Sequence, residues 1–140
     1  MFNSRITSSD YSFLDRFVKC EIDPSDFSHV AHLRLAWINI CLYGIKKAEV
    51  LIQQQIQNYV TFLGAEDKYN TTLTIAATKA VYHFMLKSKS HNFIDFIEEF
   101  PRLEKDFKSL LDTHYSFNII HSDIAKTEFI EPDLMPFDPV

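Results

Sequence analysis

Two histidines and an arginine stand close together in an otherwise apolar segment, residues 27–37, which reads Phe-Ser-His-Val-Ala-His-Leu-Arg-Leu-Ala-Trp. His29 and His32 are three residues apart and share one face of a helix, whereas Arg34 projects from the other flank. Neutral imidazoles at this spacing can bind zinc, iron or copper, or can hydrogen bond to a ligand. The more ordinary alternative is a half-exposed His29 beside the helix start and a core His32 bonded to a backbone carbonyl.

Arg34 lies in a segment that is apolar on nearly every side, which indicates a buried helix. A buried guanidinium without a partner is strongly unfavourable, so we expect Arg34 to meet a carboxylate, carbonyl groups or an anionic ligand. A structural ion pair would use Glu49, Glu131 or Asp133. An anionic ligand would instead make Arg34 the charge anchor of a binding site.

A second polar group opens a later helix. Tyr69 and Thr72 stand at the start of a segment whose first backbone N–H groups have no partner within the helix, and such groups attract anions. Hydroxyl groups at a helix start more often serve as caps or bond to the preceding turn. The sequence has no glycine-rich phosphate loop, no nucleophile elbow and no paired catalytic carboxylates, so whether the protein is an enzyme stays open.

Apolar residues at three- and four-residue spacing predict the helices that position these groups. Ser28 suits the N-cap of the second helix, and Gly44 and Gly64 suit the ends of the second and third. Ser9 or Asp10 could cap the first. The expected helices span roughly 10–20, 29–43, 46–63, 71–87 and 92–100, with one more after Pro101 or a kink there.

Composition predicts the fold class. The chain has 140 residues, of which 46% are hydrophobic and only two are glycine, as is typical of a single helical domain. We therefore predict that residues 1–140 form one all-α domain. It consists of a bundle of five or six helices and an extended C-terminal tail, whose prolines exclude regular helix.

Charge and cysteine content restrict the partners and the location. The net charge is −5 and the basic residues are scattered, which argues against nucleic acid binding. No stretch approaches the roughly 20 apolar residues of a membrane span, and no apolar signal segment follows Met1. Cys20 and Cys41 fit two reduced thiols, so we predict a cytoplasmic protein that binds no membrane.

Three segments together resemble a family of small uncharacterised bacterial proteins. They are the 27–37 helix, Tyr-Asn-Thr-Thr-Leu-Thr at 69–74 and Glu-Pro-Asp-Leu-Met-Pro at 131–136. The resemblance implies that one site is formed by His29, His32, Arg34, Trp37, Tyr69, Thr72 and Thr74. The family has His-Glu where this chain has Asn-Thr at 70–71, which weakens any metal or acid–base role carried over from it.

The functional prediction is a pocket between the second and fourth helices that binds a small polar or anionic ligand. His29 and His32 would be hydrogen-bond partners, Arg34 the charge anchor, and Tyr69 and Thr72 the orienting hydroxyls. The alternative is a protein-interaction module with a structural polar network, its partner surface formed by exposed residues such as Phe93, Phe96 and Phe137. A metal-assisted enzyme is third, and no cofactor can be named.

Overall fold

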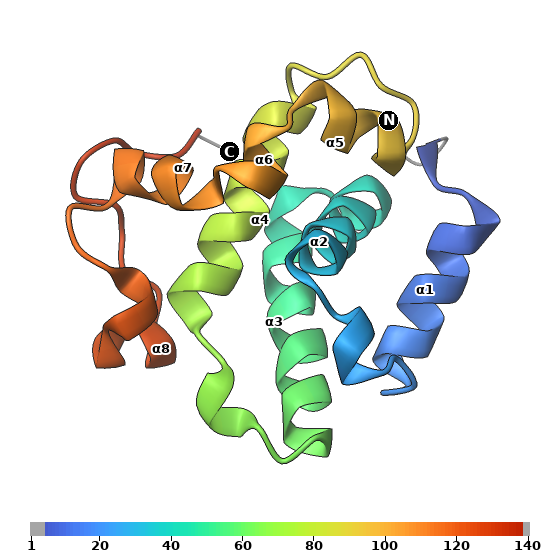
Figure 1. Ribbon diagram of the computed structural model, residues 1–140, viewed down its shortest axis with the longest axis horizontal. Coiled ribbons are helices and arrows are strands. Elements are labelled where there is room, and N and C mark those ends of the chain that lie inside the picture. Colours follow the sequence, from blue (N-terminus) through green and yellow to red (C-terminus); the bar gives the residue numbers. More distant parts are fainter. Residues whose placement is uncertain (1–4, 139–140) are drawn as a thin grey trace.

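The computed structural model describes residues 5–138, and over this range the chain is helical between its loops, with no strand (Figure 1). The predicted all-α, single-domain fold is confirmed. None of the described helices is long and apolar enough to cross a membrane. The α-helices are α1 (Ser8–Val18), α2 (His29–Tyr43), α3 (Ile45–Phe62), α4 (Thr71–Met85), α5 (Phe93–Glu99), α6 (Arg102–Lys105), α7 (Phe107–His114) and α8 (Asp123–Thr127).

The helix boundaries follow from local chemistry. Ser28 caps α2, because its hydroxyl accepts a hydrogen bond from the Ala31 N–H at 3.2 Å. Gly44, which ends α2, has a φ of 80° that a side chain would disfavour. The predicted cap of α1 is wrong: Thr7 is the cap, and Asp10 completes a reciprocal capping box by accepting the Thr7 N–H at 3.0 Å.

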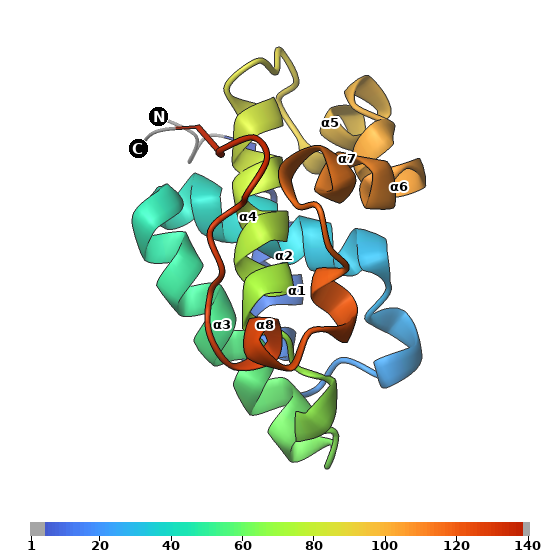
Figure 2. The same ribbon diagram turned by 90° about the vertical axis from the view of Figure 1, so that its left-hand side faces the viewer.

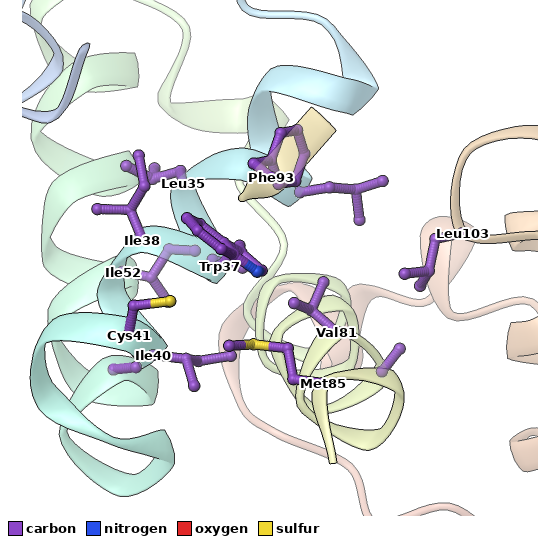
Figure 3. Packing of buried hydrophobic residues seen from close by; sticks show 14 of the residues in the cluster. Leu35, Trp37, Ile38, Ile40, Cys41, Ile52, Val81, Met85, Phe93 and Leu103 are labelled. Atoms are coloured by element: carbon purple, nitrogen blue, oxygen red, sulfur yellow. The ribbon is translucent and has the colours of Figure 1, made fainter. Parts of the chain in front are cut away.

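Three long helices surround the main core. Helix α2 contacts both α3 and α4, which also contact each other, and α1 packs against α3. Trp37 of α2 lies at the centre, 1% exposed, among side chains such as Ile52 of α3 and Val81 and Met85 of α4 (Figure 3). Each such buried side chain contributes about 1.5–3 kcal/mol of transfer free energy, which explains why α2 is apolar on nearly every side.

The segment after α4 forms three short helices, α5 to α7, where the sequence suggested two or one kinked helix. Pro101 opens α6, and Asp106 leaves the helical region with φ −141°, which separates α6 from α7. Helix α5 is anchored in the core, because Phe93 and Phe96 are 7% and 1% exposed and Phe93 packs edge-on against Trp37. The prediction that Phe93 and Phe96 are exposed is therefore wrong, since the α5 face that carries them is buried, whereas Phe137, the third residue of the predicted partner surface, is half-buried in the tail.

The C-terminal tail, residues 128–138, is extended, as predicted, and runs along α4 (Figure 2). It covers a second, smaller cluster whose buried members are Ala76, Leu111, Tyr115, Ile119 and Ala125. The His114 carbonyl accepts the Leu134 N–H at 3.0 Å, and the His114 ring stacks on Phe137 at 4.2 Å. Ser116 and Asp133 also hydrogen bond. The tail is thus part of the packed structure.

Candidate functional site

Arg34 meets a carboxylate, as the physics of burial requires, but the partner is Asp10 of α1. Its Nη2 and Nε atoms donate to Asp10 Oδ1 at 2.9 and 3.1 Å, and Nη2 also donates to the Ser9 hydroxyl at 3.2 Å. The guanidinium lies 4.7 Å from the centre of the Phe13 ring, a cation–π distance. Arg34 therefore holds α1 against α2.

The predicted structural partners of Arg34 are wrong because each faces another element. Glu49 pairs with Lys79 at 2.8 Å, which joins α3 to α4. Asp133 bonds Ser116 within the tail region, and the exposed Glu131 also lies in the tail. The correct partner, Asp10, lies near the opposite end of the chain.

A cleft of about 830 Å³ opens beside this ion pair, between α1, the start of α2 and the start of α5. This volume is within the usual range of small-molecule sites, roughly 300–1,000 Å³. Its polar lining residues come from α1, from α2 and the turn before it, and from the start of α5. The residues that line the cleft include Phe13, Arg16, Asp26, Val30, Arg34 and Asp95.

The cleft is lined by charged side chains whose hydrogen-bonding groups are only partly used by the described protein atoms. The Arg34 side chain is 26% exposed, and its Nη1 atom makes no hydrogen bond within the described residues. Arg16 and Asp26 also line the cleft, and neither side chain forms an ion pair or hydrogen bond with the part of the chain that the structure describes. Asp95, by contrast, accepts a bond from Asn92 at 3.0 Å. The cleft therefore offers both a cationic and an anionic group to a ligand.

The hydrogen bond to a backbone carbonyl that was expected of His32 is made by His29 instead. His29 is exposed, yet its Nε2 atom is 2.8 Å from the Leu103 carbonyl, to which it donates, and this bond links α2 to α6. His32 has a buried Nε2 atom without a hydrogen-bond partner among the described residues. Burial lowers the pKa of His32 to about 4, and the nearby His29 adds to this effect. His32 is consequently neutral near pH 7.

Tyr69 and Thr72 lie at the start of α4 but serve different purposes. The Thr72 hydroxyl donates to the Glu128 carbonyl at 2.8 Å and accepts the Ile130 N–H at 3.0 Å, so it holds the tail. Burial raises the pKa of Tyr69, whose hydroxyl has no described partner within hydrogen-bonding geometry. Thr74 bonds back to the Asn70 carbonyl at 2.8 Å, the ordinary role of a helical threonine.

The polar atoms of the five predicted site residues are directed to different parts of the molecule. Arg34 lines the cleft beside α1, whereas Tyr69 lines a smaller hollow of about 360 Å³ between α3, α4 and α8. Neither cavity is lined by both residues, nor by His29, His32 or Thr72. Within residues 5–138, no three His, Cys, Asp or Glu side chains are grouped as a metal site would require. The candidate site is therefore the cleft that contains Arg34.

Sequence reasoning missed Asp10, Arg16 and Asp26, which belong to the cleft. Asp10 carried a usable signal, because Thr7 and Asp10 have the spacing of a capping box, which places the carboxylate on the first turn of α1. Arg16 and Asp26 carried none, since scattered charges ordinarily mark a solvated surface.

Comparison with known proteins adds no relative to this geometry: no family model, curated protein or solved structure matches the chain.

Proposed function

We propose that this protein binds a small polar ligand carrying an anionic group, in the cleft between α1, α2 and α5. One observation carries the proposal: Arg34 lines the cleft while its Nη1 atom is unused by the described protein atoms. A guanidinium offers five N–H donors in a planar fork that suits carboxylate and phosphate groups. The donors on Nη1 remain for a ligand.

The environment of Arg34 favours binding of this kind. Asp10 and Phe13 fix the orientation of the guanidinium, so little conformational freedom is lost when an anion binds. Partial burial strengthens the attraction relative to a fully hydrated arginine. The anchor role predicted for Arg34 is retained in this proposal, but the pocket lies on the α1 side of α2, whereas the sequence had placed it between α2 and α4.

A protein-interaction module remains the second candidate, on a different surface from the one the sequence suggested. Phe117, Leu134 and Met135 are 38%, 57% and 53% exposed, and the bonds that join the tail to α7 bring these side chains to one region. A metal-assisted enzyme is third. We also propose a cytoplasmic location, supported by the free thiols of Cys20 and Cys41, and kinship with the bacterial family that the three motifs resemble.

The test of the ligand-binding proposal is a thermal-shift screen against a panel of small carboxylates and phosphates, followed by titration of the compounds that stabilise the protein. Arg34→Lys keeps a positive charge for Asp10 but removes the fork, so we expect it to weaken binding about tenfold or more. The matched control is Arg102→Lys, at an exposed position on α6, which should bind normally.

Two outcomes would overturn the proposal. Either no compound of the panel stabilises the natural protein, or Arg34→Lys is stabilised as much as the natural protein. Helical circular dichroism should be the same in all three proteins, which separates a loss of binding from a loss of fold.

A further inference from the structure

We infer that the cleft takes a zwitterionic ligand with the chemistry of a short peptide, namely a free carboxylate, a free ammonium group and an apolar body. The inference rests on the proposed function, because it takes Arg34 as the anchor of the anionic end. It adds the ligand's second charge, its approximate length and the character of its middle part.

Asp26 supplies the group that would recognise the ammonium end. It lies in the 3₁₀ turn Pro24–Asp26, just before α2, and lines the same cleft as Arg34. Its carboxylate is exposed and has no ion pair or hydrogen bond with the described residues, whereas Asp10 is paired with Arg34 and Asp95 accepts one hydrogen bond from the Asn92 amide. Asp26 is therefore the lining carboxylate whose oxygens are both open to a cationic group.

The spacing of the two charges sets the length of the ligand. Arg34 lies six positions after Ser28, the cap of α2, and at 1.5 Å per residue this is a rise of about 9 Å along the helix. Asp26 lies two positions before Ser28, outside α2, whereas Arg34 lies in the second turn of that helix, and both line the cleft. An extended peptide advances about 3.3–3.6 Å per residue, so about three residues bridge such a distance.

Apolar side chains form part of the cleft wall beside these charged and polar groups. Phe13 and Ile22 contribute from α1 and the loop after it, Val30 and Ala31 from α2, and Phe93 from α5. Ile94, beside Phe93, is 71% exposed and lines the cleft as well. Apolar side chains of a ligand would be removed from water here, at about 25 cal/mol for each Å² buried.

Isothermal titration with three related probes tests the inference. They are the tripeptide alanyl-phenylalanyl-alanine with free ends, its N-acetyl derivative and its C-terminal amide. We expect the free tripeptide to bind at least about tenfold more tightly than either blocked form, because each block removes one charge.

Variants of the chain separate the two ends. Asp26→Asn should lower the affinity for the free tripeptide about five- to tenfold and leave that for the N-acetyl derivative unchanged, because only the free form has an ammonium group. Asp112→Asn, at an exposed position on α7 outside the cleft, is the matched control and should bind as the natural protein does.

The outcomes distinguish this inference from the function on which it rests. If the N-acetyl derivative binds as tightly as the free tripeptide, or if Asp26→Asn has no effect, the zwitterionic ligand is wrong and the anion site survives. If none of the three probes binds while a compound of the earlier panel does, the peptide chemistry is wrong and the proposed function again survives. If nothing binds in either experiment, both fail.

Discussion

At the scale of single residues, Arg34 combines a structural task with an available binding group. Nε and Nη2 hold Asp10, whose side chain is only 5% exposed, while Nη1 is left over. Removing the whole side chain would leave the buried Asp10 carboxylate without a cationic partner, with only the Thr7 N–H as a donor, which is strongly destabilising. Arg34→Lys is for this reason a more informative variant than Arg34→Ala, because it preserves the charge that Asp10 needs.

His32 should make the stability of the protein depend on pH. Its pKa is near 6.5 in the unfolded chain and about 4 in the folded protein, because burial disfavours the charged ring. Between these values the unfolded state binds more protons, so stability is complete above pH 6.5 and falls as the pH falls toward 4. The loss from this group is of the order of 3 kcal/mol.

The measurement is urea unfolding at several values between pH 7 and pH 4. We expect His32→Leu to lose less stability than the natural protein over this window, whereas His91→Gln, at an exposed position, should follow the natural protein. An unchanged pH dependence in His32→Leu would show that this ring is not responsible.

At the scale of elements, the tail and α4 are joined through one hydroxyl group. Thr72 is fully buried and bonds both the Glu128 carbonyl and the Ile130 N–H. The hydroxyl of Tyr115, at the end of α7, also donates a hydrogen bond to the Ile130 carbonyl at 2.7 Å. The start of the tail is therefore held from two sides, by groups far apart in the sequence.

Thr72→Val should loosen the tail, because valine has nearly the same shape but can neither donate nor accept. We expect faster amide hydrogen exchange at Ile130 and a loss of about 1–2 kcal/mol in stability. Thr78→Val is the matched control: Thr78 is equally buried on the same helix, but its hydroxyl bonds the Thr74 carbonyl at 2.8 Å and does not touch the tail. Equal exchange at Ile130 in both variants would contradict the role of Thr72.

At the scale of the whole molecule, the apolar interior is divided into two clusters of unequal size. The main cluster has buried members from each of α1 to α7, with Leu110 contributed by α7, whereas the second has five buried members, contributed by α4 and the segments from α7 to α8. Fewer buried contacts mean a smaller free energy for local opening. The half of the molecule that carries the cleft should therefore be the more rigid one.

Native-state hydrogen exchange measures this difference directly. We expect the amides of α2 and α3 to open only with the free energy of global unfolding, and those of α7 and α8 to open at a lower free energy. The same opening free energy throughout would mean that the two clusters unfold as one unit.

The sequence predicted local features well and long-range pairings poorly. Ser28, Gly44 and Gly64 mark helix boundaries in the structure as they do in the sequence prediction, because capping and positive φ depend only on adjacent residues. Cys20 shows the limit even locally: it has a φ of 59° at the end of α1, a position where the sequence offered no glycine to reveal the turn. Phe93 and Phe96 were misplaced because a short helix does not disclose which of its faces is covered.

By itself the sequence determined that the chain is helical, that α2 is buried, and that a charge as enclosed as Arg34 needs a partner. These follow from apolar periodicity and from the cost of burying a charge, which hardly depend on the rest of the chain. Only the tertiary structure decided that Asp10 is this partner, that Thr72 serves the tail, and that a cleft lies between α1, α2 and α5. Such pairings depend on how the helices cross and how the loops return, and no short segment of sequence contains that information.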